Sequence, residues 1–213
     1  MDEYVTVKGR GTHVTKVRGS RFLASVAPAS SEEEAQEFVT QVCREHHQAT
    51  HNCYAYRVGL GDLVVQRHSD AGEPAGTAGK PILEAIQDHQ LTNAVVVVSR
   101  YFGGTKLGKG GLARAYKESA VSALEGAGLV TAVVTDDFPV SFPYRLTREV
   151  ERLLKKHHAR TVEGKYGQIV SLTLRVRRGH SDGLRKELAV IGAGQVEIGD
   201  SRRSTHVVAR KHG

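Results

Sequence analysis

The order of hydrophobic and polar residues predicts short strands and three helices in the first two thirds of the chain. Alternating residues around positions 4–8 and 22–27 are typical of half-buried strands. The runs 52–60 and 63–68 predict two more strands, joined by a hairpin turn at Gly61-Asp62. Four consecutive valines within 93–102 predict a buried strand, and 129–135 predicts another.

Three helices are predicted between these strands. Ser30 precedes the first, and Glu33 stands three residues later, which is the spacing of a capping box. Apolar residues at helical spacing extend this helix to about position 47, and similar spacing predicts helices over 82–89 and 112–127. In the last helix the residues that share one face are Leu112, Tyr116, Ala120 and Leu124.

The last third of the chain predicts a second arrangement. Strands over 138–142, 160–166, 169–177 and 195–201 alternate with helices over 145–158 and 181–191, the second of which would have Ser181 as its N-cap. The resulting order is β-α-β-β-α-β, the pattern of a ferredoxin-like fold. We therefore expect an α+β protein with two domains.

Charge divides the chain at the same place. Residues 1–136 contain 14 Lys and Arg against 15 Asp and Glu, whereas residues 137–213 contain 16 against 8, so the net charge of +7 arises entirely in the last third. We place the domain boundary at Asp136-Asp137, with one domain over 1–136 and the other over 137–213. A segregated basic excess favours an acidic partner.

Composition excludes several classes of protein. The 213 residues are 39% hydrophobic and 25% charged, which is ordinary globular usage and argues against disorder. The chain has no uninterrupted apolar stretch of about 18 residues, so no transmembrane helix is expected. Two cysteines, Cys43 and Cys53, are too few for a disulfide scaffold. The start of the chain shows no signal peptide, and we expect a cytoplasmic protein.

A run of glycines and basic residues between 100 and 112 resembles an anion-binding loop. It joins a buried strand to a helix, where glycine lets the backbone approach a ligand and the helix N-terminus presents free N–H groups. The candidate ligands are Arg100, Gly103, Gly104, Lys106, Gly108, Lys109, Gly110, Gly111 and Arg114. Gly110 stands where a P-loop has Ser or Thr, so we reject Mg²⁺-dependent nucleotide hydrolysis. The open alternatives are phosphate-backbone binding and a turn packed closely against a sheet.

A second loop, over 70–81, is also rich in glycine. Asp70 and Glu73 could act as a pair of general bases, and Thr77 and Lys80 could hold an anion. Spacing along the chain does not show that the two carboxylates converge. The alternative is a structured loop that leads into a helix, with Pro81 in its first turn.

Cysteine and histidine residues gather between positions 43 and 53. These residue types bind zinc, but their spacing fits no standard zinc motif. A Cys–His nucleophilic pair is a further alternative, although nothing identifies an oxyanion hole. We favour His51 and Cys53 as partly buried polar residues near the glycine-rich loops, and expect no metal and no cofactor.

The strand predicted over 169–177 alternates strictly. The residues expected to face the core are Val170, Leu172, Leu174 and Val176. Because both helices of a ferredoxin-like domain cover one face of its sheet, Arg175 and Arg177 would stand on the open face, with Arg178 at the strand end. RNA-recognition domains place aromatic residues there, and this strand has none, so phosphate contact is the favoured role. The alternative is a solvated face that keeps the domain soluble.

Several motifs together resemble the IMPACT/YigZ family. They are Ser20-Arg21-Phe22, the run Ala49–Arg57, Gly72-Glu73-Pro74 with Gly76–Pro81, and Arg100–Gly104 followed by Lys106-Leu107-Gly108 and Gly110-Gly111-Leu112. The resemblance covers about residues 20–116 and makes His51, Cys53, Tyr54 and Glu73 candidate cleft residues. The family usually reads S-D-D-G-E-P-S-G where this chain has Ala71 and Ala75, so two polar side chains are lost.

This resemblance implies a first domain similar to domain 2 of ribosomal protein S5, and a second domain similar to one in elongation factor G. Eukaryotic relatives regulate translation by competing for a protein partner of a stress kinase. We therefore expect binding of RNA or the ribosome, with a protein partner in translation as a further hypothesis. The alternative is an enzyme that acts on a phosphorylated small molecule between the two glycine-rich loops. No membrane association is expected, and the sequence does not indicate an oligomeric state.

Overall fold

The computed structural model describes residues 2–208, which form two compact units. One unit is Tyr4–Thr131, and the other combines residues 2–3 with Ala132–Val208. The division falls inside strand β7 (Leu129–Pro143), and the predicted boundary after Asp136 lies in this same strand. Both units contain sheets and helices, so the protein is mixed α and β with two sheets and, within residues 2–208, five α-helices.

The unit over Tyr4–Thr131 is built on a five-stranded antiparallel sheet. Its strands, in spatial order, are β2 (Gly11–Val17), β3 (Ser20–Pro28), β6 (Ala94–Tyr101), β4 (His51–Val58) and β5 (Val65–Ser69). Strand β6 lies at the centre, and its first seven residues are buried. The continuous valine run therefore has the position that its sequence predicts, because both faces of a central strand must be covered.

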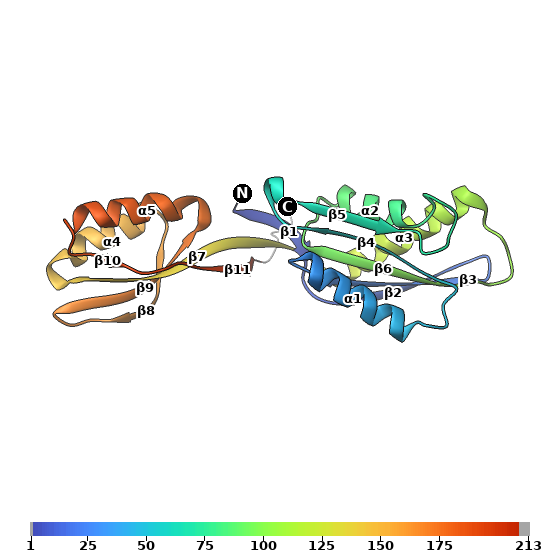
Figure 1. Cartoon of the computed structure of the whole chain (residues 1–213), viewed down its shortest axis with the longest axis horizontal. Helices are drawn as coiled ribbons and strands as arrows, with labels where there is room; N and C mark the ends of the chain where they lie inside the picture. The colour runs from blue at the N-terminus through green and yellow to red at the C-terminus, as the bar shows by residue number, and fades with distance from the viewer. Residues whose placement is uncertain (1, 209–213) are drawn as a thin grey trace. The chain divides into compact units, whose positions relative to one another are not determined.

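Helices cover both faces of this sheet (Figure 1). Helix α1 (Glu32–Glu45) packs Phe38 and Val42 against Val95 and Val97 on one face. Helices α2 (Gly79–Asp88) and α3 (Gly108–Ala127) lie on the other face, where Ile82, Ile86, Tyr116 and Leu124 join the larger core. The residues predicted to share one face of the third helix are all buried there.

The helix starts differ from the predictions by a few residues. The N-cap of α1 is Ser31, whose hydroxyl accepts a hydrogen bond from Glu34 N at 3.2 Å, so the capping box predicted for Ser30 and Glu33 was displaced by one residue. Glu34 Oε2 in turn accepts hydrogen bonds from Ser30 N and Oγ at 2.7 and 2.8 Å. Helix α3 begins at Gly108, inside the glycine-rich run and before the predicted start at Leu112.

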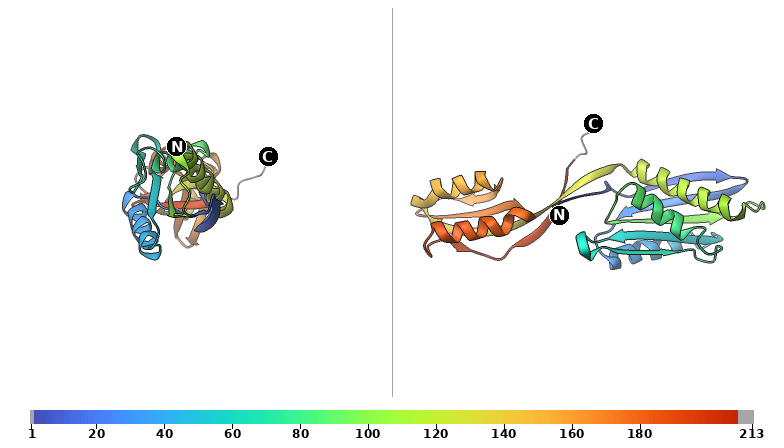
Figure 2. Two further views of the ribbon diagram at one scale, coloured as in Figure 1. Left: turned by 90° about the vertical axis from the view of Figure 1, so that its right-hand side faces the viewer. Right: turned by 90° about the horizontal axis from the view of Figure 1, so that it is seen from above.

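The unit over Ala132–Val208 contains four antiparallel strands in the order β10-β7-β9-β8. The elements along the chain are β7, η2 (Tyr144–Leu146), α4 (Thr147–Lys156), β8 (Arg160–Lys165), β9 (Ile169–Arg177), α5 (Arg178–Ile191), β10 (Glu197–Ile198) and β11 (Arg202–Val208). Helices α4 and α5 lie on the same face of the sheet, as Figures 1 and 2 show. Strands β1 (Glu3–Val7) and β11 also pair with β7.

Three predictions for this part of the chain were wrong in detail. The strands predicted over 129–135 and 138–142 are one strand, because Asp136 and Asp137 continue the pairing of β7 with β9. Helix α5 begins at Arg178, so Ser181 lies buried in its first turns and is not an N-cap. The strand predicted over 195–201 is reduced to β10, and β11 follows it. None of the helices within residues 2–208 combines the length and hydrophobicity needed to span a bilayer.

Candidate functional site

A buried ion pair joins the two glycine-rich loops in the unit over Tyr4–Thr131. Glu73 comes from the loop between β5 and α2, and Arg100 lies near the end of β6. Arg100 Nη1 donates a hydrogen bond to Glu73 Oε1 at 2.7 Å, and Tyr116 of α3 donates its hydroxyl to the same oxygen at 2.8 Å. The side chains of Glu73 and Arg100 are only 3% and 7% exposed, so the two opposite charges are almost completely desolvated.

Strand β4 borders this pair with two of its motif residues. Cys53 donates its thiol proton towards the carbonyl of Asp70, with Sγ 2.9 Å from that oxygen and 3.4 Å from the hydroxyl of Tyr116. His51 Nδ1 is 2.9 Å from the carbonyl of Ala71, and a carbonyl can only accept, so Nδ1 carries the proton. The other nitrogen, Nε2, is 4.0 Å from Glu73 Oε2, beyond hydrogen-bond distance.

Burial keeps the thiol of Cys53 and the hydroxyl of Tyr116 protonated. Desolvation raises the pKa of the Cys53 thiol to about 12, and the nearby carboxylates of Glu73 and Asp70 act in the same direction. The pKa of the Tyr116 hydroxyl is also raised, chiefly by desolvation. A thiol attacks only as its thiolate, so this geometry does not support the alternative of a Cys–His nucleophilic pair.

Asp70 organises the loop around the ion pair. Its carboxylate accepts hydrogen bonds from the backbone N–H groups of Gly76, Ala78 and Gly79, at 2.8, 2.9 and 2.9 Å. Desolvation raises the pKa of this carboxyl, but the three N–H groups outweigh it, so the pKa lies below its ordinary value. With these lone pairs engaged, Asp70 serves as the anchor of the loop and not as a second base beside Glu73.

The glycine-rich loop between β6 and α3 has an exposed, basic end. Lys106, Lys109 and Arg114 are exposed around the start of α3, and Phe102 is 48% exposed. In the described part of the chain no side chain caps this helix, so its first backbone N–H groups face outward. A hollow of about 300 Å³ beside the helix start is lined by residues that include Arg18, Arg114 and Glu118.

Two glycines of this run, Gly103 and Gly110, differ in how much space a side chain would have. A Cβ at Gly103 would lie 1.9 Å from the carbonyl carbon of Gly19, so this position must be glycine because the loop touches the turn between β2 and β3. Gly110 has open space around it and an ordinary φ. Glycine weakens a helix relative to alanine, and packing does not explain its presence at Gly110.

The other candidate site residues of this unit differ in how deeply they are buried. Arg100 also lies 3.4 Å from the hydroxyl of Ser20, so it belongs to the buried pair and is not an exposed anion ligand. Thr77 is buried and donates its hydroxyl to the carbonyl of Pro74 at 2.6 Å, whereas Lys80 is exposed at the start of α2. Tyr54 is half-buried, and its ring stacks against Tyr56.

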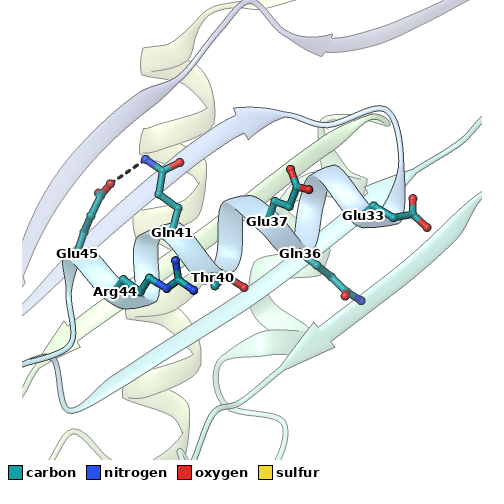
Figure 3. Close-up of a pocket in the computed structure, with 7 residues that line it drawn as sticks. All are labelled: Glu33, Gln36, Glu37, Thr40, Gln41, Arg44 and Glu45. Carbon is teal, nitrogen blue, oxygen red and sulfur yellow. Dashed lines mark hydrogen bonds between the residues drawn. The ribbon is translucent and has the colours of Figure 1, made fainter.

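The exposed surface of α1, on the other side of the sheet, is acidic and would repel an anion. Figure 3 shows the exposed side of α1, where a wide hollow is bordered by polar side chains. Three carboxylates, those of Glu33, Glu37 and Glu45, stand there against the single guanidinium of Arg44. Helix α3, with its basic start, and this acidic helix lie on opposite faces of the sheet.

In the other unit, the arginines of β9 are on the open face but already paired. Arg175 donates two hydrogen bonds to the carboxylate of Asp137, at 2.7 and 2.5 Å, and Arg177 donates one to Glu3 at 2.5 Å. The alternating residues from Val170 to Val176 are buried under α4 and α5, as their pattern predicts. Arg178 is exposed at the first position of α5.

No group of three or more potential ligands among the His, Cys, Asp and Glu side chains of residues 2–208 is placed to hold a metal ion. Cys43 is half-buried on α1, and Cys53 points into the ion-pair cluster.

Sequence reasoning missed two members of the buried cluster. Tyr116 was predicted as a core residue of its helix, and it is one, but its hydroxyl also completes the shell of Glu73. Ser20 receives a hydrogen bond from Gly103 N at 3.2 Å, which joins the β2–β3 turn to the glycine-rich loop. A buried tyrosine among small helix residues was the available signal, since its hydroxyl needs a partner.

Comparison with known proteins agrees with the motifs. Residues 18–124 match the Impact N-terminal domain, and residues 140–195 match a domain of unknown function, DUF1949. The chain is 35% identical to the IMPACT family member YvyE of Bacillus subtilis over 93% of this chain and 91% of that protein. It is 30% identical to the IMPACT family member YigZ of Escherichia coli, over 93% of this chain and 98% of that one.

The eukaryotic likeness and the structural likeness are of different extent. Protein IMPACT of Mus musculus is 37% identical over 43% of this chain and 29% of that protein. A solved structure described as that of a hypothetical protein superposes with a TM-score of 0.65 at 28% identity, and covers 93% of this chain and 97% of that one.

Proposed function

The chain belongs to the IMPACT family, and from this we propose that it binds RNA or the ribosome and takes part in the regulation of translation. Eukaryotic members of the family are linked to that process, and the region that matches the Impact N-terminal domain, residues 18–124, carries the buried ion pair and both glycine-rich loops. The same premise supports an S5 domain 2-like fold for the first unit, a ferredoxin-like fold for the second, and a place in the cytoplasm.

The observation that carries this proposal is the exposed start of α3. Backbone N–H groups without a capping side chain stand beside Lys106, Lys109 and Arg114. The helix dipole favours negative charge at this end, and lysine or arginine contacts provide most of the affinity for a phosphate backbone. Phe102 offers an exposed ring on which a base can stack.

The buried ion pair holds this loop in shape. Arg100 and the hydroxyl of Ser20 connect Glu73 to the backbone of Gly103. The loop therefore need not be ordered when a ligand binds, which lowers the entropic cost of binding. The other unit carries the positive excess of the chain, and Arg178, exposed at the start of α5, provides a second point for phosphate contact, whereas Arg175 and Arg177 are held in ion pairs by Asp137 and Glu3.

The test is RNA binding by the full chain at several salt concentrations. Each phosphate contact releases counterions, so the logarithm of the affinity should fall linearly with the logarithm of the salt concentration. The double variant Lys106→Ala with Lys109→Ala should bind about ten-fold more weakly, and the salt slope should fall by roughly 1.5 to 2. The matched control is Arg10→Ala with Arg44→Ala, which removes two charges on the α1 side of the sheet.

Sequence preference should not change in the lysine variant, because phosphate contacts carry no base information. Equal loss of affinity in the control and in the lysine variant would show that RNA binding depends only on the total charge of the protein and not on Lys106 and Lys109. Salt-independent binding, or none, would contradict the proposal. Co-sedimentation with ribosomes, using the same pair of variants, separates ribosome binding from binding of free RNA.

A further inference from the structure

A cavity of about 250 Å³ opens within the unit over Ala132–Val208. Its polar lining residues are Thr135, His158, Arg160, Arg175, Arg177 and His206. In the register of the sheet, Thr135 stands opposite Arg177, and Asp137 opposite Arg175. Thr135, Arg175 and Arg177 alternate with the buried residues that pack under α4 and α5, so these three side chains lie on the face of the sheet without helices.

Two polar atoms of this cavity lack a partner within residues 2–208. The hydroxyl of Thr135 is buried in a residue that is only 7% exposed, and it makes no hydrogen bond there. The Nε2 atom of His206 is buried beside the same cavity and is also unpaired. Buried polar groups without partners destabilise a fold, and a ligand in the cavity that pairs with both atoms removes this cost.

Positive charge prevails around the cavity. The three guanidinium groups of Arg160, Arg175 and Arg177 face two carboxylates, Asp137 and Glu3. Arg175 and Arg177 each pair with one of them, whereas Arg160 makes no ion pair in the described part of the chain. One cation thus remains without a counter-charge, and the imidazoles of His158 and His206 add donors to it.

The neighbouring basic groups keep the carboxyl of Asp137 ionised. The hydrogen bonds from Arg175 lower the pKa of the Asp137 carboxyl against the effect of desolvation, and the charges of His206 and Arg160 lower it further. Asp137 therefore stays ionised and holds the guanidinium of Arg175, which lines the cavity, in an ion pair.

We propose that this cavity binds a single phosphate group, either as free phosphate or as the terminal monoester of a small molecule. Thr135 Oγ1, His206 Nε2 and the guanidinium of Arg160 are the donors available to its oxygens. A tetrahedral oxyanion accepts hydrogen bonds from several directions at once, and charge-assisted bonds of this kind are the stronger ones. The proposal does not depend on RNA binding, because the start of α3, which carries the RNA proposal, belongs to the unit over Tyr4–Thr131, whereas this cavity belongs to the other unit.

The experiment is a calorimetric titration of the full chain with inorganic phosphate, and in parallel with a nucleoside 5′-monophosphate and the matching nucleoside. Phosphate should bind at one site per chain. A monophosphate that binds more tightly than inorganic phosphate, with no binding of the nucleoside, identifies the monoester as the better source. Equal affinities identify the phosphate group alone.

Three variants locate the site. Thr135→Val keeps the shape of the side chain and removes its hydroxyl, and should weaken binding about ten-fold, as the loss of a hydrogen bond to a charged group does. Thr135→Ser restores the hydroxyl and should restore binding, which separates ligand contact from a defect in folding. Arg160→Ala should also weaken binding about ten-fold, whereas Arg152→Ala, an exposed residue on the helix-covered side, should leave it unchanged.

Several outcomes overturn the proposal. They are the absence of saturable phosphate binding, retention of full affinity in both Thr135→Val and Arg160→Ala, and equal losses in Arg152→Ala and Arg160→Ala. Binding of an oligonucleotide that lacks a terminal phosphate, with no binding of phosphate or monophosphate, assigns the face to backbone contacts and also rejects it.

Discussion

Arg100 and Glu73 stand 27 residues apart in the chain and meet through a 2.7 Å contact between Nη1 and Oε1 in the interior of the first unit. Each comes from a different motif of the chain, so the pair brings these two motifs into contact. One partner precedes the loop over 101–108, and the other belongs to the loop over 70–78. One desolvated ion pair thus connects the two glycine-rich loops.

Removing the charge of Glu73 should strongly destabilise the protein. Glu73→Gln keeps the shape of the side chain but leaves the guanidinium of Arg100 buried without a counter-charge. Breaking a buried pair in this way costs about 3–5 kcal/mol. Urea unfolding of the full chain measures the loss, and Glu37→Gln on the exposed face of α1 is the control, with an effect within about 0.5 kcal/mol. Equal stabilities of the two variants would show that the pair contributes nothing.

Cys53 should be unreactive in the folded protein. Burial raises the pKa of its thiol to about 12, so almost no thiolate exists near pH 8. Alkylation followed by mass spectrometry should label Cys43 first and Cys53 only after unfolding, because Cys43 is half-buried and Cys53 fully buried. The variant Cys43→Ser simplifies the measurement. Rapid labelling of native Cys53 would favour an activated thiol and reopen the nucleophile hypothesis.

The contribution of Asp70 to stability should depend on pH with a definite sign. Its pKa in the folded protein lies below the ordinary value of 3.8, so the ionised form stabilises the fold. That stability is complete above about pH 4 to 5 and is lost as the pH falls through the lowered pKa of the folded state. Asp70→Asn should therefore be less stable than the parent at pH 7, and the difference should shrink below pH 4.

Thermal or urea unfolding over this pH range checks the prediction for Asp70. The control is Asp62→Asn, an exposed residue of the 3₁₀ turn η1 (Gly61–Leu63), which should track the parent at every pH. A difference for Asp70→Asn that stays constant down to pH 2 would exclude an ionic contribution.

Two glycine substitutions should have opposite effects on folding. Gly103→Ala places a Cβ 1.9 Å from the backbone of Gly19 and should destabilise the unit or displace the loop. Gly110→Ala meets nothing and should stabilise the helix, by up to about 1 kcal/mol. If a ligand approaches the start of α3 closely, Gly110→Ala should still weaken RNA binding at several salt concentrations. Unchanged RNA binding by Gly110→Ala would place the ligand elsewhere.

Much of the fold follows from local pattern. Strict alternation from Ile169 to Arg177 predicts the bounds of β9 and its buried face, and the valine run predicts the central position of β6. The element boundaries were less accurate where two neighbouring residues can compete for one role, as Ser30 and Ser31 do at the start of α1. The acidic pair Asp136 and Asp137 predicts a boundary between two strands, but both residues pair with β9 and therefore remain within β7.

For the candidate site, too, some features follow from local sequence and others from tertiary contacts. The sequence alone determined which residues are candidates for the site, because glycine runs, basic side chains and family motifs are local features. The tertiary structure decided which of them meet. It buried Arg100 against Glu73, turned Asp70 into a loop anchor, left Lys106 and Lys109 exposed, and opened a cavity beside Thr135. The physical reason is that desolvation and ion pairing depend on contacts between residues far apart in the chain, and spacing along the chain contains no record of those contacts.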